Sequence, residues 1–226
     1  MKQAQKGFTL VEIAIVLVII GLLLGGILKG QEMITQAKIK NVVADFSGIS
    51  AAYYGYQDRY RAIPGDDPTA GTRWAGAVIG AAPGNGVVAG TYNNACPAIA
   101  VAGTPETCLW WDHLRRAGFV AGSGATQPFN AVTGLLGVQT GDGVAVVGAT
   151  LLTAGNGFSS LIVCSANLPD KIAIAVDTQM DDASPATGTV RGLLQTAPNP
   201  NIGAALPATA AYAETGTNTY TLCRSM

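Results

Sequence analysis

The feature that most constrains this chain is an uninterrupted apolar stretch near its N-terminus. Phe8–Leu28 comprises 21 residues with a single charged side chain, Glu12. As an α-helix it would span roughly 30 Å, the thickness of the hydrocarbon core of a bilayer. Lys2 and Lys6 precede it. Since positive charges stay on the cytoplasmic side, we expect a cytoplasmic N-terminus and export of the rest of the chain.

Two ordinary interpretations of this stretch are unsatisfactory. A secretory signal peptide needs a shorter apolar run that ends in a small-residue cleavage site, and none follows here. A plain membrane anchor leaves Glu12 unexplained, because a carboxylate within lipid costs about 3 kcal/mol or more and normally has a partner. A third interpretation supplies that partner.

The segment Lys6-Gly7-Phe8-Thr9-Leu10-Val11-Glu12 resembles the cleavage and methylation motif of type IV prepilins and pseudopilins. It combines a short basic leader, a Gly-Phe junction, a glutamate four residues later and an unbroken apolar helix. The resemblance implies that a prepilin peptidase, acting also as N-methyltransferase, cuts after Gly7 and methylates the new amine of Phe8. It further implies that Glu12 pairs with the Phe8 amine of a neighbouring subunit, which would remove an unpaired charge from an apolar filament core.

The same resemblance implies a domain organisation and a fold. Residues 1–7 would be a leader peptide, residues 8–60 a long helix whose part 8–28 spans the membrane, and residues 61–226 a globular pilin head. The fold class would be α+β, with the long helix packed on an antiparallel sheet and with loops bounded by disulfides. The implied partners are other copies of the chain, the prepilin peptidase, the pilus assembly machinery and the inner membrane.

Small residues within the apolar stretch suggest a second assembly feature. Gly21 and Gly25 form a G-x-x-x-G step, which lets helices approach closely. An equally good explanation is that glycine is commoner in membrane helices. Many type IV pilins carry a proline about one turn later, where this chain has Lys29. A proline-driven melted segment is therefore in doubt, although Gly25 and Gly26 could loosen the helix.

The helix is predicted to continue to about Tyr60, where Pro64-Gly65 follows and ends it. One apolar stripe runs along this part at steps of four and three residues: Val42, Phe46, Ile49, Tyr53, Tyr56 and Tyr60. We expect the stripe to pack on the head. A coiled-coil dimer is the alternative, but it would need a longer repeat.

The head alternates short apolar runs with Gly, Pro, Asn and Thr, which predicts a strand-rich domain. The expected strands are Val87–Tyr92, Val144–Leu152, Ser159–Ser165, Thr189–Gln195 and Thr219–Arg224. Leu109–Ala117 has the spacing of a short helix.

The chain has four cysteines, whose number fits disulfides formed in an oxidising compartment. Four cysteines allow three pairings. We favour Cys96–Cys108, which closes a short loop, and Cys164–Cys223, which ties the C-terminal strand to the head. Four buried free thiols are the alternative.

Three segments of the head resemble a subset of large prepilin-like proteins: Ala62–Pro68, Leu109–Gly118 and Val176–Asp182 with Pro185 and Gly188. The last lies in Lys171–Asp182, which alternates like a strand but also has helical spacing, and the resemblance favours a short helix. Ala183 stands where that pattern has glycine, so the turn after Asp182 is uncertain.

Acidic residues in these segments are candidates for a calcium site, because carboxylates are its usual ligands. They are Asp66, Asp67, Asp177, Asp181 and Asp182. No EF-hand loop surrounds them, so helix capping and turn formation are the preferred roles. We expect no other cofactor.

Composition argues against other classes of function. Only 12% of residues are charged and the net charge is −1, so there is no basic surface for nucleic acid. His113 is the single histidine, and no serine lies in a nucleophile elbow. We therefore expect no enzyme, and packing as the role of His113.

The leading hypothesis is a structural subunit of a type IV pilus-like filament, held in the inner membrane before assembly and at the cell surface afterwards. The closest alternative is a pseudopilin of a type II secretion system, in a periplasmic pseudopilus. A membrane-anchored binding or enzymatic domain is the alternative from another class.

Overall fold

The computed structural model describes residues 9–141, 157–202 and 211–226. Two units make up the chain, residues 1–38 and residues 39–226. Helix α1 (Leu10–Tyr60) contributes its N-terminal part to the first unit and its C-terminal part to the second.

In the first unit, α1 runs without a break. Gly25, Gly26 and Lys29 all lie within the helix. At the position where many pilins have proline, Lys29 forms an exposed ion pair with Glu32, one turn later in the helix. Its Nζ lies 2.8 Å from Glu32 Oε2. The glycines therefore do not interrupt the helix, because its backbone hydrogen bonds need no side chain.

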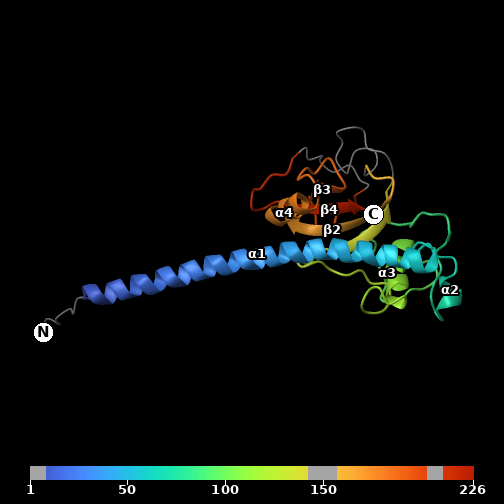
Figure 1. The fold of residues 1–226 in the computed structure, drawn as a ribbon, viewed down its shortest axis with the longest axis horizontal. Helices are drawn as coiled ribbons and strands as arrows, with labels where there is room; N and C mark the ends of the chain where they lie inside the picture. The colour runs from blue at the N-terminus through green and yellow to red at the C-terminus, as the bar shows by residue number, and fades with distance from the viewer. Residues whose placement is uncertain (1–8, 142–156, 203–210) are drawn as a thin grey trace. The chain divides into compact units, whose positions relative to one another are not determined.

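The second unit contains a four-stranded sheet with the order β1-β2-β4-β3, in which all neighbouring strands are antiparallel. The strands are β1 (Leu136–Thr140), β2 (Leu161–Pro169), β3 (Val190–Leu194) and β4 (Thr219–Ser225). Three helices accompany α1 (Figure 1): α2 (Ala70–Arg73), α3 (Glu106–Arg116) and α4 (Asp170–Met180). This confirms the expected α+β, pilin-like class.

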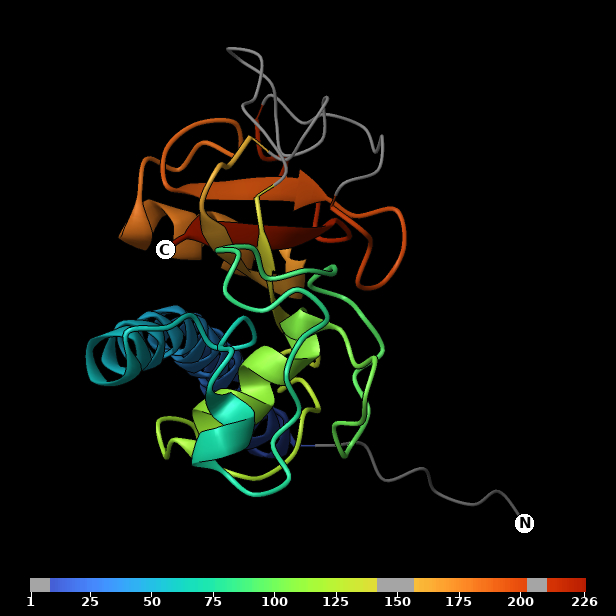
Figure 2. The ribbon, with the colours of Figure 1, turned by 90° about the vertical axis from the view of Figure 1, so that its right-hand side faces the viewer.

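The two faces of the sheet belong to different cores, because side chains alternate along a strand. Leu161 and Val163 of β2 join the large core, which also contains apolar residues of α1, α3 and α4. Ile162 and Cys164 join a smaller core on the opposite face. Figure 2 shows α3 and the C-terminal part of α1 on the same side of the sheet.

The apolar stripe of α1 lies in the large core, as the helical spacing predicted. Its buried members are Ile39, Val42, Phe46, Ile49, Ala52, Tyr53 and Tyr56. Tyr60 is half-buried at the end of the helix. Each large apolar side chain buried here contributes about 1.5–3 kcal/mol, so this stripe is a principal stabilising contact of the head.

Predicted strands Ser159–Ser165, Thr189–Gln195 and Thr219–Arg224 correspond to β2, β3 and β4, and Val144–Leu152 lies outside the described residues. The prediction of a strand at Val87–Tyr92 was wrong. Backbone N–H groups there donate to side chains, from Val88 to Thr140 Oγ1 (2.8 Å) and from Tyr92 to Gln139 Oε1 (3.0 Å). The segment therefore lies along β1 without joining the ladder.

Strand β1 was missed because its second residue is Gly137, and glycine within a strand normally weakens it. Here the glycine is required by a close approach. A Cβ atom at this position would lie 1.9 Å from the carbonyl oxygen of Tyr92. A contact between residues distant in sequence thus requires glycine at position 137, and no local sequence pattern reveals that contact.

Both short helices predicted in the head are present as α3 and α4. Each has a proline at its N-cap, Pro105 or Pro169, whose extended ψ (145° and 146°) places it just outside the helix. α1 ends before Pro64-Gly65, because Arg61 adopts a left-handed backbone (φ +54°). Ala183, after α4, is also left-handed (φ +61°), so the turn forms without the glycine.

Replacing Ala183 by glycine is expected to stabilise the head. A left-handed alanine costs about 1–2 kcal/mol, and the entropy of glycine in the unfolded chain offsets about 0.5–1 kcal/mol of that. The net gain of about 0.5–1 kcal/mol would raise the Tm by about 1–4 °C in thermal unfolding. Ala51→Gly, at an exposed position within α1, is the matched control and should lower the Tm; a fall in both variants would contradict the role of the turn.

Candidate functional site

The single acidic residue of the apolar stretch has a defined local environment. Glu12 Oε2 accepts hydrogen bonds from the backbone N–H and the hydroxyl of Thr9, both at 2.8 Å. The backbone N–H of Glu12 donates to Thr9 Oγ1 at 3.3 Å. This reciprocal arrangement is a capping box, in which Thr9 precedes the helix and Glu12 is its third residue.

The capping box solvates the Glu12 carboxylate without neutralising it, because Thr9 offers dipoles and no positive charge. The apolar side chains around it are exposed, and Leu10 is 90% exposed. Sequence reasoning missed Thr9, although the threonine-x-x-glutamate spacing is a recognisable signal.

The two other predicted features of this segment are less constrained. Gly21 and Gly25 lie on α1, and a Cβ atom at either would meet nothing within 4 Å. Their surface is therefore open in the single chain. Gly7 and Phe8 lie outside the described residues.

By length and composition, α1 can cross a membrane. Its most apolar 18-residue window has a mean hydropathy of 2.8, and it is the only such helix among residues 9–141, 157–202 and 211–226. This finding agrees with the predicted membrane segment but does not distinguish it from a signal sequence, since both are apolar and near the N-terminus.

A comparison with family models found one match, in this segment. Residues 2–28 carry the prokaryotic N-terminal methylation motif. This motif is the prepilin-type cleavage signal of type IV pilins and pseudopilins. The match covers the leader and the apolar stretch and not the head. No curated protein and no solved structure gave a significant match to the chain.

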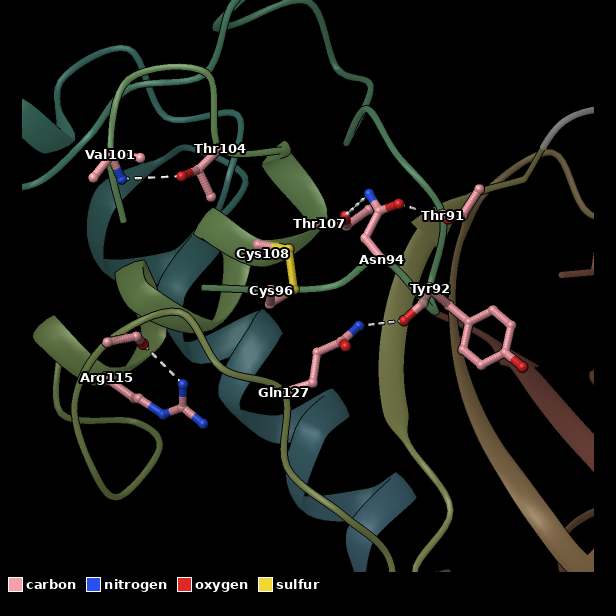
Figure 3. Close-up of a disulfide and its surroundings, with 11 residues drawn as sticks. Thr91, Tyr92, Asn94, Cys96, Val101, Thr104, Thr107, Cys108, Arg115 and Gln127 are labelled. Carbon is pink, nitrogen blue, oxygen red and sulfur yellow. Dashed lines mark hydrogen bonds between the residues drawn. A yellow bond between two sulfur atoms is a disulfide. The ribbon is translucent and has the colours of Figure 1, made fainter. Parts of the chain in front are cut away.

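Two disulfides hold loops of the head in place, and both have the predicted pairing. Cys96–Cys108 joins a loop to α3, with Cα atoms 5.3 Å apart (Figure 3). Cys164–Cys223 joins directly opposed residues of β2 and β4. By loop entropy alone they would contribute about 3 and about 4 kcal/mol.

Side chains around Cys96–Cys108 tie its loop to the rest of the head. Gln127 donates from Nε2 to the carbonyl oxygen of Tyr92 (Figure 3), and Asn94 donates to Thr107 Oγ1 at 3.1 Å. The Tyr92 hydroxyl donates to the carbonyl of Pro200 at 2.6 Å. These bonds fix a long loop that has no regular secondary structure of its own.

Asp66 and Asp67, predicted as weak calcium candidates, are engaged in hydrogen bonds. Asp66 accepts from the backbone N–H groups of Gly84, Asn85 and Gly86. Asp67 accepts from the hydroxyls of Tyr56 (2.6 Å) and Thr69 (2.8 Å) and forms an ion pair with Arg73 (2.6 Å). Burial opposes the charge, but the hydrogen bonds from Tyr56, Arg73 and Thr69 lower the pKa of Asp67 to about 2.

The other three candidates form a cluster at the end of α4. One carboxylate oxygen from each of Asp177, Asp181 and Asp182 lies within 4.8 Å of the others. Asp177 is fully buried, and its Oδ2 accepts from the Tyr212 hydroxyl at 2.6 Å. Burial, followed by the nearby charges of Asp182 and Asp181, raises the pKa of Asp177 to about 6.

His113 is buried within α3, in agreement with the predicted packing role. Its Nδ1 accepts from the backbone N–H of Gly65 at 3.0 Å, which leaves Nε2 to donate to the carbonyl of Val78 at 2.9 Å. The neutral imidazole thus links two loop segments to one helix. Burial lowers the pKa of His113.

Acid should destabilise the head through His113. Because its pKa is lower in the folded chain, the unfolded chain binds more protons below about pH 6.5, and stability is lost as the pH falls through that value. Between pH 7.5 and 5.5 we expect the Tm of the wild type to fall by about 2–4 °C more than that of His113→Gln. His113→Gln is the reference for the wild type at each pH, because it lacks the titrating imidazole. An equal fall of the Tm in both proteins would contradict this role of His113.

Proposed function

We propose that the chain is a structural subunit of a type IV pilus-like filament, which assembles by packing of its N-terminal helices. The observation that carries the proposal is the carboxylate of Glu12 within an exposed apolar helix that bears the prepilin-type cleavage signal. An apolar helix surface of this length must be covered by lipid or by other helices. A filament of such helices covers it once the subunit leaves the membrane.

The charge of Glu12 explains why processing would precede assembly. Within a bundle of apolar helices the carboxylate needs a positive partner, because an unpaired buried charge costs several kcal/mol. Cleavage after Gly7 creates an ammonium group on Phe8, whereas the uncut chain has a neutral amide there. Pairing of this ammonium with Glu12 of a neighbouring subunit would neutralise both charges and fix the axial stagger.

Gly21 and Gly25 would allow close helix packing in the proposed filament. Since a Cβ atom at either position meets nothing in the single chain, the absence of a side chain has no role in the fold of the subunit. It would let a neighbouring helix approach closely.

The proposal assigns the head to the filament surface. Two disulfides suit an oxidising compartment outside the cytoplasm. The subunit would sit in the inner membrane before assembly, as a substrate of the prepilin peptidase and the pilus assembly machinery, and no catalytic role is needed.

Processing is the first test. Protein recovered from the filament or cell surface should begin at N-methylated Phe8, as measured by N-terminal sequencing and intact mass. The protein that accumulates in a strain without the prepilin peptidase is the control and should retain residues 1–7. A surface form with an intact leader would refute the ion-pair model, since no ammonium would exist at Phe8.

Removal of the charge at position 12 is the second test. Glu12→Ala and Glu12→Gln should insert into the membrane normally but lower the yield of sheared filaments at least about tenfold, because the neighbouring ammonium loses its partner. Glu32→Gln is the matched control, since Glu32 is an exposed acid on the same helix with a local partner. Unchanged filament yield in the Glu12 variants would contradict the proposal.

Electron microscopy of cells with and without the chain distinguishes a pilus from a pseudopilus. Long surface fibres indicate a pilin, and a short periplasmic rod indicates a pseudopilin.

A further inference from the structure

We propose that Asp177, Asp181 and Asp182 form a binding site for a hard divalent cation, Ca²⁺ above all, at the C-terminal end of α4. This inference concerns the head alone and does not depend on filament assembly. It rests on the arrangement of three carboxylates and on an unpartnered buried oxygen among them.

The cluster concentrates negative charge in a small volume. Asp177 occupies the last turn of α4, Asp181 caps it and Asp182 follows, with one oxygen of each within 4.8 Å of the other two. The C-terminal end of a helix carries a further partial negative charge, which favours cations. None of the four ion pairs among the described residues includes these three aspartates.

The buried member of the cluster lacks a partner for half of its carboxylate. Asp177 has no exposed surface, and its Oδ1 accepts no hydrogen bond from the described residues. Its Oδ2 accepts from the Tyr212 hydroxyl. A buried carboxylate oxygen without a partner is costly, and a cation held between Asp177 and the two neighbouring carboxylates would remove that cost.

The neighbouring carboxylates are held in place by the turn that follows α4. Asp181 Oδ2 accepts from the backbone N–H groups of Thr189 and Val190. Asp182 Oδ1 accepts from the Ser184 N–H at 3.0 Å. A Cβ atom at Gly188 would lie 1.9 Å from Asp181 Oδ2, so glycine is required beside this carboxylate. These contacts orient the acids and leave lone pairs available for a ligand.

The donor set favours calcium over other metals. All three side chains offer oxygen, which suits Ca²⁺ and Mg²⁺, whereas Zn²⁺ is usually bound by nitrogen or sulfur. Ca²⁺ accepts six to eight oxygens at about 2.3–2.6 Å in a flexible geometry, while Mg²⁺ requires a near-ideal octahedron at about 2.0–2.1 Å. Oxygens up to 4.8 Å apart can share one Ca²⁺ from opposite sides. Asp66 and Asp67 differ, because protein donors already occupy their oxygens.

Thermal unfolding of the full chain in detergent micelles tests the site, with the tryptophan fluorescence of the head as the signal. For a dissociation constant within the range of about 10⁻⁴–10⁻³ M found in extracellular calcium modules, 5 mM CaCl₂ should raise the Tm by about 3–6 °C over EDTA at matched ionic strength. MgCl₂ should produce a smaller rise. No rise with calcium, or an equal rise with magnesium, would overturn the proposal.

Variants show whether the cluster is responsible. Asp177→Asn and Asp182→Asn should weaken calcium binding at least about tenfold and reduce the rise to about 1 °C. In EDTA, Asp177→Asn should be at least as stable as the wild type, since it removes a buried charge. Asp58→Asn, an exposed acid on α1, is the matched control and should keep the full rise. A full rise in Asp177→Asn and Asp182→Asn would overturn the assignment.

Direct binding gives a readout that does not depend on stability. Tb³⁺, which replaces Ca²⁺ at oxygen sites, should show luminescence sensitised by tyrosine, because Tyr212 is hydrogen-bonded to Asp177. Excess Ca²⁺ should quench it, and Asp182→Asn should weaken it even if Asp177→Asn fails to fold. Absence of sensitised emission from the folded wild type would contradict the site.

Discussion

The fold of the head depends on burial of one stripe of α1. Phe46 and Tyr56, both fully buried, lie in the same core as Trp110 and Trp111 of α3 and as one face of the sheet. The stripe belongs to the same helix as the apolar N-terminal stretch. The chain therefore uses one element for two tasks, because its N-terminal part has the composition of a membrane segment and its C-terminal part supplies a wall of the head's core.

Carboxylates organise the irregular part of the head. Glu106 accepts from the backbone of Ala89 at 2.9 Å, and Asp170 accepts from Thr215 and Gly216, both at 2.7 Å. Asp66 acts in the same way on another loop. Hydrogen bonds to a charged acceptor contribute about 1.5–3 kcal/mol each. A protein with only 12% charged residues thus uses several of its acids to anchor loops to helices.

The cluster at the end of α4 differs from these anchors. Both oxygens of Asp66 accept hydrogen bonds from backbone N–H groups. Asp177 instead has one oxygen unsatisfied and two acidic neighbours. We propose that this contrast separates acids that complete the fold from acids that attract a ligand, and residue type alone does not reveal it.

The sequence by itself determined the apolar stretch with its one acid and the helical stripe. It favoured both disulfide pairings without excluding the others, and the α+β class was implied by the family resemblance. The apolar stretch and the stripe follow from composition and local periodicity, whereas the structure decided the disulfide pairing. The tertiary structure alone decided that Val87–Tyr92 is no strand, that Gly137 lies within β1, and that Tyr212 meets Asp177. Each of these depends on contacts between distant positions; Asp177 and Tyr212, for example, are 35 residues apart. Local patterns do not encode such contacts, because the chain must first fold to bring the partners together.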